Sequence, residues 1–230
     1  MGEPDLVLAS NSPRRRELLA LGGWKFTVHP AEVDESQRPG EPPGTYVLRL
    51  AESKARTCSA SLKHRETVFT GEGVIILAAD TAVVDGNDIL GKPKSRVEAR
   101  EMLRRLRSRK HQVYTGITVM RISDGNLGTD LCVTDVPMRG YSDEEIESYV
   151  ATGDPIDKAG AYAIQHPEFH PVKTMSGCYA SVMGLPLCHL TRTLRPLNVA
   201  PRTNIPAECQ SWLNYECPIF TAVLSGGKAG

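Results

Sequence analysis

The pattern of apolar and polar positions changes repeatedly along the chain between the period typical of strands and the period typical of helices. The apolar runs DLVLAS (5–10), KFTVHP (25–30) and VIILAADTAVV (74–84) predict strands. HQVYTGITVMRI (111–122) and GTDLCVTDVPMRGY (128–141) predict a strand pair around the turn SDGN. The turn signal DGND after residue 84 predicts a further hairpin, which leads into ILGKP.

Helical periods and capping residues lie between these strands. In LVLASNSPRRRELLALGG (6–23), Ser12 and Pro13 are favoured as N-cap and first helical residue. TYVLRLAESKARTCSAS (45–61) and SRVEAREMLRRLRS (95–108) have helical spacing of their apolar residues. SDEEIESYVATG (142–153) opens with Ser142 and Glu145, the residues of a capping box.

Strands mixed with helices and hairpins predict an α/β protein with a mixed, twisted sheet. The chain of 230 residues is long enough for one sizeable domain, and we find no internal repeat or low-complexity linker. After about residue 195 the pattern weakens and prolines interrupt it. We therefore expect one domain over residues 1–195 and an irregular extension of unknown role over residues 196–230.

Charge and cysteine content narrow the functional classes. Lys plus Arg and Asp plus Glu both number 27, so the net charge of zero gives no bulk attraction for nucleic acid or an anionic membrane. The six cysteines are scattered without a CxxC pair, which favours reduced thiols over a zinc site. The N-terminus lacks the pattern of a signal peptide and no apolar run is long enough to span a membrane, so we expect a cytoplasmic protein.

Some residues contradict the element in which they lie, and these are candidates for function. The predicted helix after residue 12 begins with Arg14, Arg15 and Arg16. A cation at this end is repelled by the helix dipole, which costs about 0.3–1 kcal/mol of stability for each residue. A bound phosphate chain would reverse that sign, because free N–H groups and guanidinium groups then share one anion. A solvated basic face is the alternative.

Asp80 and Lys54 are charged residues on otherwise apolar surfaces. Asp80 interrupts the run VIILAADTAVV, where an unpaired carboxylate would cost several kcal/mol. Such a group can hold a metal ion or take a proton from water, or it can be structural and bonded to backbone N–H groups. Lys54 lies on the helical stripe of Val47, Leu50, Ala51 and Cys58, and either extends past it to water or neutralises a nearby charge.

The acidic stretch AEVDES places Glu32, Asp34 and Glu35 just after a strand. One of these carboxylates together with Asp80 would suit Mg²⁺, which prefers oxygen ligands. Read by itself, the stretch is more typical of an exposed acidic loop.

Other motifs are weaker. Gly86 to Lys92 fit the spacing of a phosphate-binding P-loop, but Pro93 stands where that loop needs Ser or Thr. Lys92 still remains a candidate single contact to phosphate. His166 and His170 have helical spacing, yet neighbouring prolines argue against a helix and a zinc site there.

Eight stretches together are similar to the Maf family of nucleoside triphosphate pyrophosphatases. They are LASNSPRRRELL, VDES, LRLAESKA, AADTAVV, LGKPKS, HQVYTGITV, DKAGAYAIQ and GLPL, in that order over about residues 5–195. GAYAIQ and AADTAVV resemble the subgroup that acts on dTTP and UTP, whereas the 7-methyl-GTP subgroup differs at the positions of Thr81 and Gln165. The resemblance implies a mixed, highly twisted sheet flanked by helices, with two lobes around a deep cleft, as in ITPase-like proteins.

The resemblance also implies roles for individual residues. Asp80 would accept the proton of the attacking water, and Glu35 with Asp80 would hold a divalent cation, Mg²⁺ or Mn²⁺. The triphosphate site would be lined by Ser10, Arg14, Arg15, Lys54 and Lys92, and substrate choice would depend on Arg14, Thr81 and Gln165. Such clustered cations would stabilise charge on the leaving pyrophosphate, and a Gln amide can complement the edge of a pyrimidine.

Two departures from the family pattern stand out. Gln165 is followed by HPEFHPVK instead of glycine, and Arg107-Ser108 replaces the common Ser-Gly.

Taken together, the residues and the resemblance predict a metal-dependent pyrophosphatase for dTTP and UTP. Its expected partner is a nucleoside triphosphate, and a homodimer is left open. The alternatives are the same chemistry on modified or purine nucleotides, and a weakly catalytic nucleotide-binding regulator of cell division.

Overall fold

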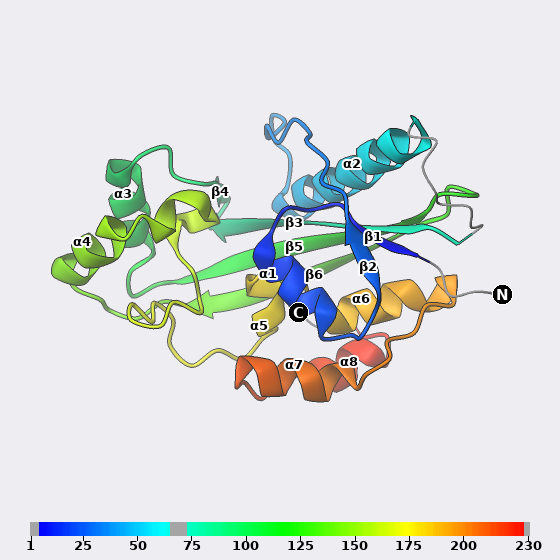
Figure 1. Cartoon of the computed structure of the whole chain (residues 1–230). Coiled ribbons are helices and arrows are strands. Elements are labelled where there is room, and N and C mark those ends of the chain that lie inside the picture. Colours follow the sequence, from blue (N-terminus) through cyan, green and yellow to red (C-terminus); the bar gives the residue numbers. More distant parts are fainter. Residues whose placement is uncertain (1–4, 65–72, 228–230) are drawn as a thin grey trace.

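One mixed sheet forms the centre of the computed structural model, which describes residues 5–64 and 73–227 (Figure 1). Its strands are β1 (Leu6–Leu8), β2 (Phe26–Val28), β3 (Ile75–Asp85), β4 (Asp88–Leu90), β5 (Lys110–Arg121) and β6 (Leu127–Pro137). Their order is β2-β1-β3-β5-β6, and β4 also pairs with β3. β1 runs parallel to β2 and β3, whereas the other pairs are antiparallel, so the predicted mixed sheet and both hairpins are confirmed.

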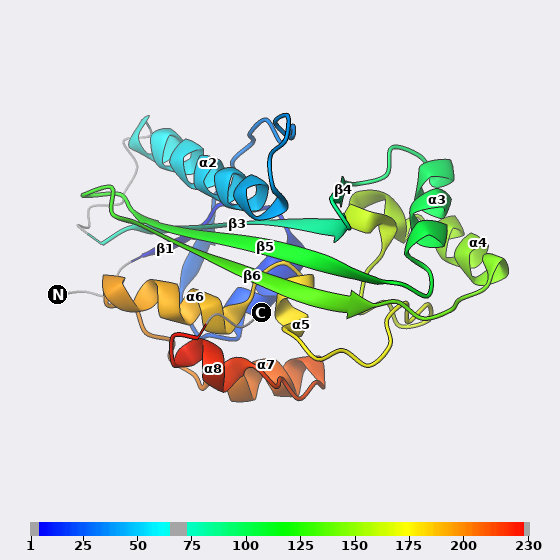
Figure 2. The same ribbon diagram turned by 180° about the vertical axis from the view of Figure 1, so that it is seen from behind.

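Helices cover both faces of this sheet. They are α1 (Pro13–Ala20), α2 (Pro43–His64), α3 (Arg96–Leu106), α4 (Asp143–Ala151), α5 (Tyr179–Val182), α6 (Leu187–Leu194), α7 (Ile205–Leu213) and α8 (Phe220–Leu224), with 3-10 turns η1 (Asp154–Asp157), η2 (Ala159–Ala161) and η3 (Arg195–Leu197). Helix α2 lies on one face, and α1, α5 and α6 lie on the other (Figures 1 and 2). Helices α3 and α4 form a second group beyond one end of the long strands. The α/β class is confirmed, while the deep cleft stays a prediction.

The predicted helix starts have the expected caps. The hydroxyl of Ser12 accepts a hydrogen bond from the backbone N–H of Arg15 at 3.4 Å, and Pro13 is the first residue of α1. At α4, Ser142 and Glu145 form the complete capping box. Local sequence therefore determines where these two helices begin.

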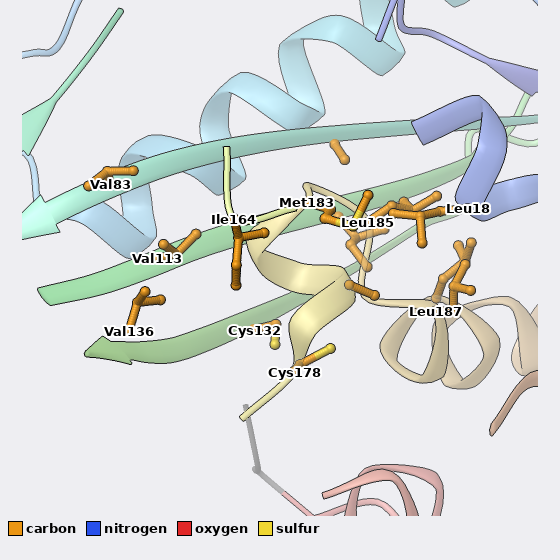
Figure 3. Packing of buried hydrophobic residues seen from close by; sticks show 14 of the residues in the cluster. Leu18, Val83, Val113, Cys132, Val136, Ile164, Cys178, Met183, Leu185 and Leu187 are labelled. Atoms are coloured by element: carbon orange, nitrogen blue, oxygen red, sulfur yellow. The ribbon is translucent and has the colours of Figure 1, made fainter. Parts of the chain in front are cut away.

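The two faces of β3 contribute to different parts of the core. Ile76 and Ala78 pack with Ala55 and Cys58 of α2, whereas alternate residues such as Val83 belong to the larger cluster on the opposite face. In Figure 3 the strand residues Val83, Val113 and Val136 lie together at one end of this cluster, and Met183, Leu185 and the α1 residue Leu18 lie toward the other end. This alternation, with period two, directs Asp80 and Thr81 to opposite faces.

The tail is helical and packed, so the prediction of an irregular extension is wrong. Helices α7 and α8 lie against α6, outside the layer that covers the sheet (Figure 2). Thr203 donates to the carbonyl of Leu21 at 2.6 Å, and Ile205 and Val223 are almost fully buried. Asn204 caps α7. The hydrophobic periodicity did not reveal these helices, because they are short and prolines lie near their starts.

The departure at Ser108 has a structural consequence. Ser108 has a φ of 58°, which is the left-handed region that favours glycine, so the Ser that stands where the family commonly has Gly is held in a strained conformation.

All six cysteines are free thiols, which agrees with the prediction. No helix among residues 5–64 and 73–227 has the length and apolar character needed to cross a membrane. Residues 1–4, part of the segment checked for a signal peptide, lie outside the described residues.

Candidate active site

The candidate site lies where one edge of β3 changes partners. Along this edge β1 pairs with β3 as far as Leu77, and β4 pairs with it from Val83 onward. On this edge, no described strand pairs with the stretch between Leu77 and Val83, which contains Asp80 and Thr81. On the other edge β3 pairs with β5 throughout this stretch. The chain leaves β1 at Ser10 and enters α1, so the start of that helix faces the opening. An α/β sheet commonly binds ligands where neighbouring strands diverge in this way.

Lys54 joins two carboxylates in this opening. Its Nζ lies 2.6 Å from Oδ1 of Asp80 and 2.6 Å from Oε1 of Glu35. The side chains of Lys54 and Asp80 are only 11% and 10% exposed, whereas that of Glu35 is 52% exposed. Lys54 therefore neutralises charge instead of only extending along apolar surface, and one of its three protons has no acceptor within the described residues.

A close approach of α2 to the sheet brings Lys54 to Asp80. Gly116 of β5 pairs with Asp80, and a Cβ on Gly116 would lie 2.8 Å from the backbone of Val47. Any side chain at Gly116 would push the helix away from the strands. Lys54 lies two turns after Val47 on the same face, so this contact fixes its reach toward Asp80.

Burial and charge shift the titration of the two carboxylates in opposite directions. Burial raises the pKa of Asp80 above its ordinary value of 3.8, although the charges of Lys54 and Arg15 oppose that rise. Partial burial also acts to raise the pKa of Glu35, but the hydrogen bond and charge of Lys54 outweigh it and leave that pKa lowered. Asp80 is thus the better proton acceptor of the pair, and Glu35 remains the more firmly ionised.

Arg15 is fixed by three hydrogen bonds on the other side of the opening. Its Nε donates to the carbonyl of Gly184 at 2.9 Å, and its two terminal nitrogens donate to Ser10 Oγ and Thr81 Oγ1 at 3.2 Å each. One N–H on each terminal nitrogen is left over, as a bidentate contact to phosphate requires. Burial lowers the pKa of Arg15, and Asp80 opposes this.

Ser10 and Gly184 complete the support of this guanidinium. Ser10 Oγ accepts from Arg15 and from the backbone N–H of Ser12 at 3.2 Å, so its own proton is free to be donated to a ligand. Gly184 has a φ of 105°, and a Cβ there would lie 3.2 Å from Thr81 Oγ1 and 3.3 Å from Arg15 Nε. The glycine therefore permits the contact between its carbonyl and Arg15.

The remaining predicted cations surround this cluster. Arg14 is partly buried, and its charge helps to lower the pKa of Arg15. Lys92 is exposed after the β3–β4 hairpin, and its charge helps to lower the pKa of Glu35. Arg16 is exposed and has no described contact with the cluster. Of the three arginines at the start of α1, Arg15 is thus the one built into the site.

Gln165 is exposed, and no described hydrogen bond joins it to the cluster. The unusual segment that follows is nevertheless well braced. His166 Nδ1 accepts from the backbone N–H of Phe169 at 3.0 Å, and the Phe169 ring stacks on Tyr149 at 4.3 Å. Arg139 donates to the carbonyl of His170 at 2.8 Å. The loop beside Gln165 is therefore held by α4 and by the segment that follows β6.

Sequence reasoning missed several contributors. The hydroxyl of Tyr46 donates to the carbonyl of Glu35 at 2.9 Å, and burial with the nearby charges of Asp80 and Glu35 raises the pKa of Tyr46 to about 12. Thr115 hydrogen-bonds Thr81 from β5 at 3.0 Å. Tyr46 lies one residue from the predicted helical stripe, and Thr115 lies in the motif HQVYTGITV, but neither has a local signal for function.

The donors present fit a magnesium-type ion. Glu35 and Asp80 approach the same nitrogen at 2.6 Å, so both carboxylates already face one position of positive charge. In residues 5–64 and 73–227, no three His, Cys, Asp or Glu side chains gather in a group that could hold a metal ion. Two carboxylates with oxygens from a substrate are a typical set for Mg²⁺, which keeps several waters.

Comparison with known proteins gives a consistent result. A family profile described as "Maf-like protein" matches residues 5–197. A protein of Anaeromyxobacter dehalogenans named dTTP/UTP pyrophosphatase is 46% identical over 195 residues, which cover 84% of this chain and 93% of that protein. A protein of Geobacter sp. with the same name is 43% identical and covers 85% and 96% of the two chains.

A third relative includes the tail. The dTTP/UTP pyrophosphatase of Thermomicrobium roseum is 40% identical over 97% of this chain and 98% of its own, so its alignment reaches beyond residue 197. The solved Staphylococcus aureus Ham1 protein overlaps with a TM-score of 0.37 and 15% identity over 58% of this chain and 71% of its own, which is too distant to add to the argument. From the match over residues 5–197 and relatives up to 46% identical, the chain belongs to the Maf family.

Proposed function

We propose that this chain hydrolyses dTTP and UTP to the nucleoside monophosphate and pyrophosphate. The observation that carries the proposal is the opening in β3, where Asp80 pairs with Lys54 and the next residue, Thr81, helps to hold the guanidinium of Arg15. The names of the relatives are those of an enzyme class that hydrolyses acid anhydrides, and they support the same class and substrates here.

Asp80 is the proposed proton acceptor for the attacking water. Its Oδ1 is engaged by Lys54 at 2.6 Å, while Oδ2 has no described hydrogen bond and remains for the water. Because burial raises the pKa of Asp80, the carboxylate gains basicity relative to an exposed aspartate and accepts a proton more readily.

Arg15, Ser10 and Lys54 are the proposed contacts to the triphosphate. Each has a proton for which residues 5–64 and 73–227 show no acceptor, and the charge of Arg15, like that of Lys54, acts on Asp80. Lys92 and Arg14 add positive charge at the periphery. Charge that develops on the leaving pyrophosphate is thereby stabilised by donors already in place, which lowers the barrier without reorganisation.

Glu35 and Asp80 are the proposed ligands of a divalent cation, Mg²⁺ or Mn²⁺. When bound, such an ion neutralises phosphate charge and orients the triphosphate. Tyr46 holds the backbone of Glu35 by its hydrogen bond, and Arg49 donates to the carbonyl of Ser36 at 3.0 Å, so the loop that carries Glu35 is fixed to α2.

The test is release of pyrophosphate across a panel of nucleoside triphosphates with Mg²⁺ or Mn²⁺. We expect dTTP and UTP to be the best substrates and Asp80→Asn to lower kcat by about 10²–10⁴-fold. Asp157→Asn is the matched control, because Asp157 also contacts a buried lysine at 2.7 Å but lies in η1. Absence of pyrophosphate with every nucleotide contradicts the proposal, and full activity of Asp80→Asn removes the base assignment.

A second candidate is the same hydrolysis of modified or purine nucleotides. It is favoured by the braced segment after Gln165, where His166 and Pro167 replace the usual glycine. The same panel separates the two, because a modified or purine nucleotide would then have the highest kcat/KM. Tight nucleotide binding with no turnover would instead indicate a regulator.

A further inference from the structure

Two threonine hydroxyl groups on the neighbouring strands β3 and β5 link Arg15 to the carbonyl of Ser181. Thr115 of β5 donates from Oγ1 to the carbonyl of Ser181 at 2.8 Å. Thr115 Oγ1 also lies 3.0 Å from Thr81 Oγ1, which accepts from Arg15 at 3.2 Å. Thr115 is fully buried, so water does not compete for these bonds.

These contacts determine the direction of each hydrogen bond. A threonine hydroxyl has a single proton, and a carbonyl oxygen only accepts, so the proton of Thr115 is committed to Ser181. The bond between the two threonines must therefore be donated by Thr81. Since the guanidinium of Arg15 only donates, the Thr81 oxygen accepts from it and retains one acceptor site.

Thr81 and Ser10 are thus opposite in character on the two sides of Arg15. Ser10 accepts two N–H groups and has a proton to give, which suits a phosphate oxygen. Thr81 has no proton to give, so it repels phosphate oxygens and suits a group that donates. The donor chemistry of a nucleoside is an N–H of the base or a hydroxyl of the sugar.

We propose that Thr115 is a positioning residue that sets substrate specificity by holding the Thr81 hydroxyl as an acceptor. The proposal rests on the proposed nucleotide substrate. In this arrangement a nucleoside that presents a hydrogen-bond donor to Thr81 binds. A nucleoside that presents an acceptor there is repelled, because its lone pair faces the free lone pair of the Thr81 oxygen. Buried polar groups left unpaired in this way discriminate strongly between analogues.

The test replaces Thr115 by valine, which keeps the shape and removes the hydroxyl. The Thr81 proton then becomes free to turn toward the substrate. Ser181 keeps a partner, because its carbonyl also accepts from the N–H of Gly184 at 2.9 Å. Thr115→Ser restores the hydroxyl. Thr118→Val is the control for folding, because Thr118 is buried on the same strand and its hydroxyl has no hydrogen-bond partner within residues 5–64 and 73–227.

Two substrate pairs exchange a donor for an acceptor. CTP replaces the N3–H of UTP by a bare nitrogen and its O4 carbonyl by an amino group, and 3′-O-methyl-UTP replaces the sugar hydroxyl by an ether. For each pair, kcat/KM and the dissociation constant are measured in all four proteins. Steric differences between the nucleotides cancel when a variant is compared with the unmodified protein.

We expect Thr115→Val to reduce the preference for UTP by about fivefold or more in one pair, through KM and the dissociation constant and not through kcat. The affected pair identifies the base or the sugar as the donor. Thr115→Ser and Thr118→Val should keep both preferences within about twofold of the unmodified protein. Unchanged preferences in Thr115→Val overturn the inference, including when its overall activity falls. If the unmodified protein releases no pyrophosphate, the proposed function fails, and the ratio of dissociation constants still decides this inference.

Discussion

Two buried lysines of this protein each contact two carboxylates, yet they differ in what they accomplish. Lys54 lies 2.6 Å from Glu35 and from Asp80, which come from a loop and from β3. Lys158 lies 2.8 Å from Asp154 and 2.7 Å from Asp157, both within four residues of it along the chain. The two lysines are 9% and 8% exposed, so burial alone does not distinguish them.

The difference is in the donors and in the partners. Lys158 also donates to the carbonyl of Asp154 at 2.7 Å, so its three protons are all used within one turn of chain. Lys54 has one proton without an acceptor in the part of the chain that the structure describes, and its partner Asp80 has a raised pKa because it is buried. Lys158 is satisfied locally and braces η1, whereas Lys54 joins distant parts of the chain, as the proposed role in a ligand site requires.

The largest expected effect that tests this comparison is on catalysis. Lys54→Met removes a proposed phosphate contact and the partner of the proposed base, so we expect kcat/KM for dTTP to fall by about 10²–10³-fold. Lys158→Met should change it by less than about tenfold, since Lys158 touches neither Asp80 nor Arg15. Steady-state pyrophosphate release measures both. Equal losses in the two variants would contradict the distinction.

The pH profile sharpens the same comparison. Asp80 accepts a proton only when ionised, so activity is lost as the pH falls through its pKa, which burial places above the ordinary 3.8. Lys54 opposes that rise, so Lys54→Met should move the acidic limb of kcat/KM to higher pH by about 1–3 units. The limb of Lys158→Met should coincide with that of the unmodified protein. A Lys54→Met limb that stays in place would show that Asp80 is not the titrating group.

The smallest expected effects are on stability, where Lys158 should matter more than its exposed partner Asp157. Lys158→Met leaves the carboxylates of η1 without their shared cation, and we expect Tm to fall by about 4–8 °C. Asp157→Asn should lower Tm by less than about 3 °C, because the Asp157 side chain is 74% exposed and solvent weakens its ion pair. Thermal unfolding monitored by circular dichroism compares them. A larger loss for Asp157→Asn than for Lys158→Met would contradict the local brace.

The sequence predicted the long elements well because their signals are local. The run VIILAADTAVV became β3, and Ser12 and Ser142 cap the helices that they were expected to cap. The prediction of an irregular tail was wrong because the tail has weak local signals. Its helices are short and are stabilised by packing against α6. Short helices gain most of their stability from such tertiary contacts and not from propensity.

The candidate site shows the same division. Asp80 and Lys54 stood out because each is charged on an apolar surface, and the structure joins them. Tyr46 and Thr115 did not stand out, since a tyrosine in a helix and a threonine in a strand contradict nothing around them. Gln165 came from resemblance to the family alone, whereas Arg14 and Lys92 were candidates from their local sequence as well. Their contacts with a nucleotide stay predictions.

The sequence by itself determined the α/β class, the starts of the main helices and the family, because hydrophobic period, capping residues and motif order are properties of neighbouring residues. Only the tertiary structure decided that Arg15, and not Arg14 or Arg16, is fixed by Ser10, Thr81 and Gly184. It alone set the direction of the hydrogen bond from Thr81 to Thr115. Such directions depend on groups more than 60 residues apart, whose protons are assigned only when the chain has folded around them.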